Sequence, residues 1–104
     1  MPVKPLQPRQ PTPNQLALRQ RLAQEWRTPT NDAGQPIILE ERDSQGHLTH
    51  VYVVWDDWGR MPGTDRSEII LDACEDRYGR EGARDVIVAM GLTREEADRM
   101  RIQY

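Results

Sequence analysis

The chain contains no phenylalanine, one cysteine and one lysine among its 104 residues. A single cysteine excludes an internal disulfide. Without phenylalanine, the three tryptophans must supply most of the aromatic bulk of any core. No run approaches the roughly 18 apolar residues of a membrane-spanning helix, and the first residues lack the apolar segment of a secretory signal. We therefore expect a cytoplasmic protein without a membrane segment.

Charge is unevenly distributed along the chain. Residues 1–31 carry five basic side chains and one acidic side chain, a net charge of +4. Residues 32–104 carry nine arginines and sixteen acidic side chains, a net charge of −7. An acidic body repels phosphate backbones. Nucleic-acid binding, the main alternative function, would therefore depend on the basic N-terminal helix, through Arg19, Arg21 and Arg27.

Proline spacing and chain length predict a short leader followed by one domain. Proline occurs at every third position from Pro2 to Pro11, so we expect residues 1–12 to be a disordered, proline-rich leader. Residues 13–104 suffice for a single α+β domain with one modest core.

Capping and periodicity predict the elements of that domain. Thr12 and Gln15 form a capping box for a helix over residues 13–26. Its apolar stripe recurs every four residues, at Leu18, Leu22 and Trp26. Residues 37–42 and 47–55 predict an antiparallel hairpin. The face of the second strand expected to lie in the core carries Val51, Val53 and Trp55.

The second half of the chain predicts a helix, a strand and a final helix. The helix that follows the hairpin is expected to begin with Thr64 or Asp65 as its cap and to end at Gly79. Its predicted buried stripe comprises Ile70, Leu71, Cys74 and Tyr78. Residues 86–89 predict a buried strand, and Thr93 with Glu96 predicts a second capping box. The order αββαβα then implies a three-stranded mixed sheet covered by helices, because strands joined through a helix lie parallel.

The order of elements and the stretch from Val53 to Ile70 resemble the BolA family, whose fold is related to the type II K-homology fold. That family carries an aromatic residue and a glycine after its second strand, followed by an Arg-His-Arg signature. Trp58 and Gly59 stand in the aromatic and glycine zone, and Arg66 falls at a matching distance. The resemblance covers residues 37–100 in order, and it implies a BolA-like fold for the strands and helices there.

The signature histidines of that family are absent here. Ser67 and Glu68 stand where the signature has His and its second Arg, and Met90 replaces the histidine of the last strand. Families of this shape bind glutaredoxins and share an iron–sulfur cluster with them. Only His47 resembles a variable ligand position of that family, so no cofactor is predicted.

Trp58 carries the main functional hypothesis. It follows the second strand in a turn, with Arg60 and Arg66 nearby in sequence, and an exposed tryptophan beside arginines is typical of a protein-binding hot spot. The alternative is that Trp58 folds back over the end of the sheet. We hypothesise a non-enzymatic interaction module whose unidentified protein partner contacts Trp58, Arg60 and Arg66.

Acidic residues allow a third hypothesis. A metal-dependent hydrolase would need carboxylates gathered around a hard divalent cation. The candidates are Asp57, Glu68 and Asp72. Asp57 follows Asp56, and adjacent residues on a strand point to opposite faces, so only one of that pair can face a given site. Most such acids are caps, turn formers or solvated charges. No metal ligand set is therefore predicted.

Overall fold

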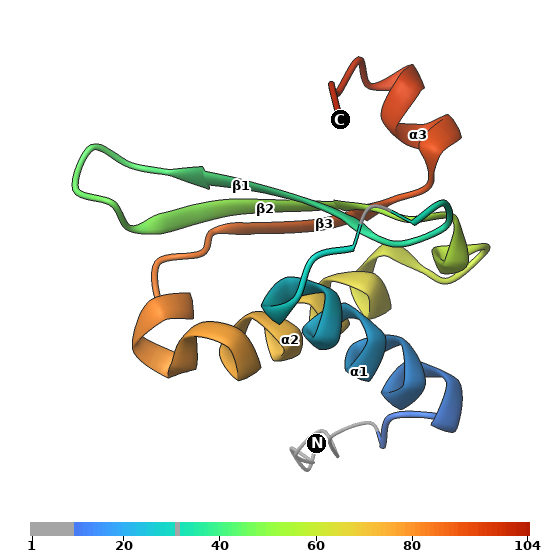
Figure 1. Ribbon diagram of the computed structural model, residues 1–104, viewed down its shortest axis with the longest axis horizontal. Helices are drawn as coiled ribbons and strands as arrows, with labels where there is room; N and C mark the ends of the chain where they lie inside the picture. The colour runs from blue at the N-terminus through green and yellow to red at the C-terminus, as the bar shows by residue number, and fades with distance from the viewer. Residues whose placement is uncertain (1–9, 31) are drawn as a thin grey trace, which may run out of the picture.

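The computed structural model describes residues 10–30 and 32–104. Its elements, in chain order, are α1 (Pro13–Arg27), β1 (Ile37–Arg42), β2 (Leu48–Val54), the short 3₁₀ helix η1 (Asp56–Trp58), α2 (Gly63–Ala83), β3 (Val88–Leu92) and α3 (Arg94–Arg99) (Figure 1). This order confirms the predicted αββαβα arrangement of an α+β domain. The BolA-like subtype stays a prediction. Most of the predicted leader, residues 1–9, lies outside the described residues.

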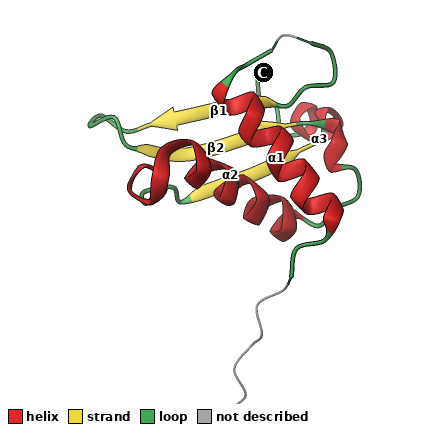
Figure 2. Ribbon diagram, turned by 60° about the horizontal axis from the view of Figure 1, so that its bottom comes forward, coloured by secondary structure: helices red, strands yellow, loops and turns green. Residues whose placement is uncertain are grey.

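The three strands form one mixed sheet in the order β1-β2-β3. β1 and β2 are antiparallel, and β2 and β3 are parallel, as the hairpin and the helical crossover predict. α1 and α2 lie side by side against one face of the sheet, whereas α3 lies over one end of the other face (Figures 1 and 2). No described helix is long and apolar enough to cross a membrane.

The main core lies between the sheet and the α1–α2 layer. Val51, Val53 and Trp55 are buried in it as predicted, each at most 1% exposed. Cys74 is also fully buried there, and desolvation raises the pKa of its thiol to about 11. Cys74 is therefore a core residue and, at neutral pH, a protonated one.

Capping of α1 and α3 is as predicted. The hydroxyl of Thr12 accepts a hydrogen bond from the Gln15 N–H, and the Gln15 side chain accepts one from the Thr12 N–H. Thr93 and Glu96 form the same reciprocal pair at the start of α3. Both helices therefore begin at the residues that their sequences indicate.

Several boundaries in the second half of the chain differ from the prediction. α2 begins at Gly63, with Pro62 as a cap that makes no side-chain hydrogen bond. The helix is interrupted at Gly79, whose positive φ of 76° suits glycine, and then continues to Ala83. β3 begins two residues later than predicted because its ladder with β2 starts at Val88.

The predicted buried stripe of α2 is also wrong at one residue. Leu71 is 38% exposed, and Ile69 is buried in its place. The stripe follows the face that α2 turns toward the sheet, and residue 71 lies on the outer side of that face.

Candidate functional site

Trp58 is buried, contrary to the hypothesis of an exposed binding surface. Its side chain is 2% exposed, its indole N–H donates to the carbonyl oxygen of Val53 at 3.0 Å, and its ring packs edge-on against Trp55. Trp58 thus folds back over the end of the sheet, which was the alternative. Of the three predicted partner residues, only Arg60 is exposed.

Arg66 is the centre of a buried hydrogen-bond cluster. Its guanidinium donates to the carbonyl oxygens of Met61 at 2.8 Å, Gly59 at 2.9 Å and Gly91 at 3.1 Å. It also pairs with the Glu96 carboxylate at 2.6 Å. With its residue 6% exposed, Arg66 joins α2, the loop after η1, β3 and α3, and its role is structural.

Glu96, the acidic partner of Arg66, has a strongly lowered pKa. Hydrogen bonding from the Thr93 N–H, followed by the bond from Arg66, lowers the pKa of Glu96 from 4.5 to about 2. Gly91 lies beside the pair, and a Cβ atom there would come within 2.8 Å of both the Arg66 Cβ and the Trp58 ring. We call Trp58, Arg66, Gly91 and Glu96 the Arg66 cluster.

The arginines predicted for nucleic-acid binding are partly neutralised by the domain itself. Arg19 forms a bidentate pair with Asp76 on α2, with N···O distances of 3.0 and 3.2 Å. Arg21 pairs with Asp57 at 2.6 Å and lies over the Trp55 ring. Arg27 is exposed at the end of α1. The three do not form a row of unpaired cations.

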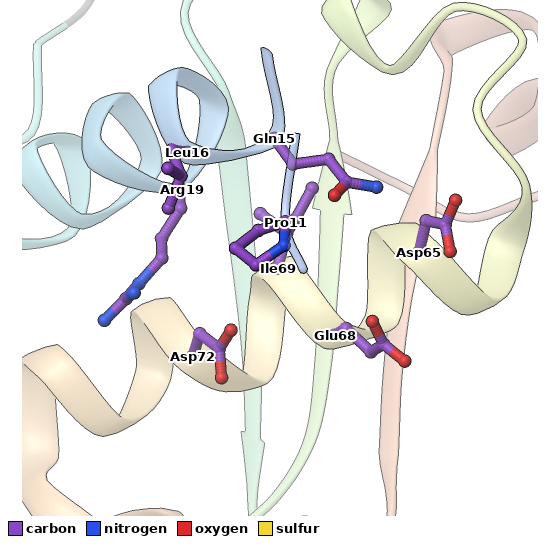
Figure 3. Close-up of a pocket in the computed structure, with 8 residues that line it drawn as sticks. All are labelled: Pro11, Gln15, Leu16, Arg19, Asp65, Glu68, Ile69 and Asp72. Atoms are coloured by element: carbon purple, nitrogen blue, oxygen red, sulfur yellow. The ribbon is translucent and has the colours of Figure 1, made fainter. Parts of the chain in front are cut away.

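The predicted acidic trio is not brought together. Glu68 and Asp72 line a pocket of about 110 Å³ between α1 and α2, with Asp65 along the same face of α2 and Arg19 on the opposite wall (Figure 3). Asp57 belongs to η1, outside this pocket, and pairs there with Arg21. Within residues 10–30 and 32–104, no three or more His, Cys, Asp or Glu side chains are grouped so as to hold a metal ion.

The backbone hydrogen bonds of the central strand β2 show which of its residues face each neighbouring strand. Just after β2, the Trp55 N–H donates to the Leu92 carbonyl oxygen, and at the other end the Thr49 carbonyl accepts from the Ile87 N–H. The backbone N–H and C=O groups of alternate residues in a strand point to the same neighbouring strand. Those of the odd-numbered β2 residues therefore point toward β3, and those of the even-numbered residues point toward β1.

The register of the hairpin then fixes the outer side of β1. The even-numbered β2 residues pair with Ile37, Leu39 and Glu41. The N–H and C=O groups of Ile38 and Glu40 therefore point away from the sheet. No hydrogen bond to these outward groups exists within the described chain, so the edge of β1 is open.

A half-open pocket of about 340 Å³ lies beside this open edge. Its lining combines aromatic rings, prolines, isoleucines and two carboxylates, supplied by Glu25, Trp26, Pro29, Thr30, Pro36, Ile37, Ile38, Glu40 and Tyr78. We call it the β1 groove. Its volume falls at the lower end of the range for ligand pockets, and its mixture of apolar walls and a few polar groups is typical of them.

Glu40 organises the floor of the β1 groove. Its Oε2 accepts hydrogen bonds from the Trp26 indole N–H at 3.1 Å and the Tyr78 hydroxyl at 2.6 Å. The two rings meet edge to face, with centroids 6.1 Å apart. Arg42 lies 3.7 Å from the same oxygen, while the Oε1 atom accepts no hydrogen bond from the described residues.

Glu25 supplies a second carboxylate to the groove. It is 6% exposed, and it accepts hydrogen bonds from the Thr30 N–H at 2.8 Å and the Thr30 hydroxyl at 3.0 Å. In the part of the chain that the structure describes, no cation lies within ion-pairing distance of it. A buried carboxylate without a cation is unusual, because desolvation disfavours its charge.

The groove residues were not identified from the sequence as a site. Trp26 and Tyr78 fall in predicted core stripes, and Glu25 and Glu40 contribute to the sequence prediction only through their charge. The available signal was the predicted strand order, since a hairpin followed by a parallel crossover leaves β1 at an edge.

No family model matches the chain, and no curated protein or solved structure matches it. The geometry of its own residues is the basis for the functional argument.

Proposed function

We propose that this chain is a non-enzymatic protein-interaction module that binds an extended segment of a partner protein along the open edge of β1. The observation that carries the proposal is the coincidence of that edge with the β1 groove. Ile38 and Glu40 supply outward backbone groups, and their side chains line the groove. An added strand would gain backbone hydrogen bonds from the edge and side-chain contacts from the groove, which is the mode called β-augmentation.

The position of the surface differs from the one expected around Trp58. Trp58 and Arg66 hold the sheet end together, whereas the groove presents Trp26 and Tyr78 beside an unpaired strand. Long unpaired edges are a liability that proteins usually cover or charge. The charged residues of β1, Glu40 to Arg42, are suited to limiting self-association while leaving the edge accessible.

The nucleic-acid alternative has weaker support. Arg19 and Arg21 are already paired with carboxylates of the domain. Phosphate binding would have to compete with these pairs in the field of an acidic body. A salt-dependent affinity for RNA would support this alternative, because phosphate binding releases counterions.

The test is selection of binders from a library of random linear peptides on the full-length chain. Each selected peptide is then titrated into isotopically labelled protein and followed by NMR. We expect the largest shift changes at the Ile38 and Glu40 amides and at the Trp26 indole N–H. Shifts confined to the α1–α2 pocket of Figure 3 would contradict the proposal. A short RNA titrated at two salt concentrations tests the alternative in the same sample.

A further inference from the structure

We infer that the segment bound at β1 carries a lysine or arginine directly opposite Glu40. This inference rests on the proposed function, because it specifies the partner of the same edge. Its occupant is an extended segment of another protein with a cationic side chain on its groove face and an apolar side chain two residues away.

The pairing geometry decides which partner side chains enter the groove. Directly opposed residues of adjacent strands place their side chains on the same face, about 4.5–5.5 Å apart at Cβ. The partner residues opposite Ile38 and Glu40 would therefore point into the β1 groove. The residue between them would point to the opposite face of the sheet, beside Leu39. Only alternate positions of the partner are read by the groove.

The position opposite Glu40 favours a cation. Opposite charges on directly paired residues stabilise a sheet, and like charges destabilise it. The Oε1 atom of Glu40 is free to accept a hydrogen bond within the described chain, since Trp26, Tyr78 and Arg42 all approach Oε2. A guanidinium or ammonium group at this position would therefore gain an acceptor without displacing an existing bond.

Glu25 strengthens that preference. Its buried carboxylate lines the same groove, and among the described residues Thr30 is its one hydrogen-bond partner. A cation entering the groove would pair with a carboxylate that has no ion-pair partner among residues 10–30 and 32–104, which is favourable in a partly desolvated site. The Trp26 ring lines the same groove, and an arginine plane can stack against an aromatic ring; the Tyr78 ring already carries Arg42 and Arg77 within cation–π distance.

The position opposite Ile38 favours an apolar residue. Pro29 and Pro36 line the groove together with Ile38. A β-branched partner side chain would pack against Ile38 as a cross-strand pair. The preferred segment therefore reads cation, any residue, apolar residue when it runs antiparallel to β1.

Two synthetic peptides test this inference on the full-length chain. The first is Ser-Thr-Arg-Thr-Val-Thr-Ser, which in antiparallel register places Arg opposite Glu40 and Val opposite Ile38. The second has Glu in place of Arg. Dissociation constants are measured from NMR shifts of the Ile38 and Glu40 amides. We expect the arginine peptide to bind about ten-fold more tightly, which corresponds to roughly 1.4 kcal/mol.

Matched variants assign the preference to one carboxylate. Glu40→Gln keeps a side-chain oxygen for Trp26 and Tyr78 but removes the charge, so the arginine preference should fall toward unity. Glu41→Gln removes a charge from the adjacent residue, which points to the other face, and should leave the preference unchanged. An equal loss in both variants would overturn the inference, because it would show general attraction to an acidic surface.

The outcomes separate the inference from the proposed function. If both peptides shift the Ile38 and Glu40 amides with equal affinity, edge binding stands and the cation preference is wrong. If neither peptide shifts them at any concentration reached, edge binding itself is contradicted. If the arginine peptide shifts only Asp65, Glu68 and Asp72, the cation site lies in the α1–α2 pocket and the inference is overturned.

Discussion

The two edges of this small sheet are treated in opposite ways. On β3, the carbonyl oxygens of Ala89 and Gly91 accept hydrogen bonds from α2 side chains, the Ser67 hydroxyl at 2.6 Å and the Arg66 guanidinium at 3.1 Å. On β1, no side chain of the described residues covers the outward groups of Ile38 and Glu40. The outward carbonyl oxygens of β3 are bonded by side chains of the domain, whereas those of β1 lie beside a pocket.

The difference shows how one helix can protect an edge without adding a strand. α2 follows the crossover to β3, so its first turns bring Arg66 and Ser67 to that edge. α1 precedes the hairpin and reaches β1 only near its C-terminal end, through Trp26. Protection of an edge is one of the ways in which proteins avoid unwanted strand pairing, and its absence at β1 is the basis of the proposed function.

The largest expected effect comes from removing Arg66 from the β3 edge. Arg66→Ala would leave Glu96 without its cation and three carbonyl oxygens without a donor, so we expect a loss of about 3–5 kcal/mol in the free energy of unfolding. Urea denaturation measures it. The matched control is Arg60→Ala, an exposed arginine in the same loop region, which should change stability by less than about 0.5 kcal/mol. Equal effects of the two substitutions would contradict the role of the Arg66 cluster.

Proline substitutions compare the two sides of β1 directly. Leu39→Pro removes an N–H that faces β2, whereas Ile38→Pro removes one that faces outward. We expect Leu39→Pro to be more destabilising by about 1–3 kcal/mol, because it leaves an acceptor on β2 unpaired. Thermal unfolding of the two variants gives the difference. Equal destabilisation would show that the outward N–H of Ile38 also has a partner.

Acid titration tests the β3 edge without removing a side chain's bulk. The folded-state pKa of Glu96, about 2, lies below its ordinary value of 4.5. Its contribution to stability is therefore fully present above pH 4.5 and is lost as the pH falls from 4.5 toward 2. The stability of Glu96→Gln should depend less on pH in this window than that of the unmodified chain. Glu95→Gln is the control, since Glu95 is exposed and its ion pair in the described structure is with Arg99; a matching change in both variants would contradict the assignment.

The smallest effect is expected at the floor of the β1 groove. Tyr78→Phe removes the hydroxyl that donates to Glu40 and should cost about 0.5–1.5 kcal/mol of stability. Burial and the Glu40 carboxylate both raise the pKa of this hydroxyl. Tyr104→Phe removes a similar bond to Asp98 at the exposed C-terminus and should cost less. Denaturant midpoints of the two variants decide the order.

Local signals in the sequence were sufficient for most of the fold. The two capping boxes, the hairpin and the buried face of β2 depend on residues close together in the chain, and all were predicted. The starts of α2 and β3 lack such local signals, because Pro62 caps α2 without a side-chain hydrogen bond and the start of β3 depends on a tertiary contact. β3, for example, starts where Val88 meets His50, although the apolar run begins earlier.

The candidate site was harder to predict for a related reason. The local sequence leaves the exposure of Trp58 open, because the residue follows a strand among polar residues. Its burial depends on Gly91, which lies 33 positions later and leaves room for the indole ring. Glu25, Glu40 and Tyr78 come from three different elements, and nothing in their local sequence indicates that they meet. Edge status alone was predictable from strand order.

Amide hydrogen exchange along β1, measured by NMR on the free protein, distinguishes an open edge from a paired one. An open edge predicts alternation: the amides of Leu39 and Glu41 exchange slowly because they bond to β2, and those of Ile38 and Glu40 exchange fast because they point outward. Adding the arginine peptide should slow the second pair. Uniform slow exchange of all four amides in the free protein would contradict the account, because it would show that the edge of β1 is already paired.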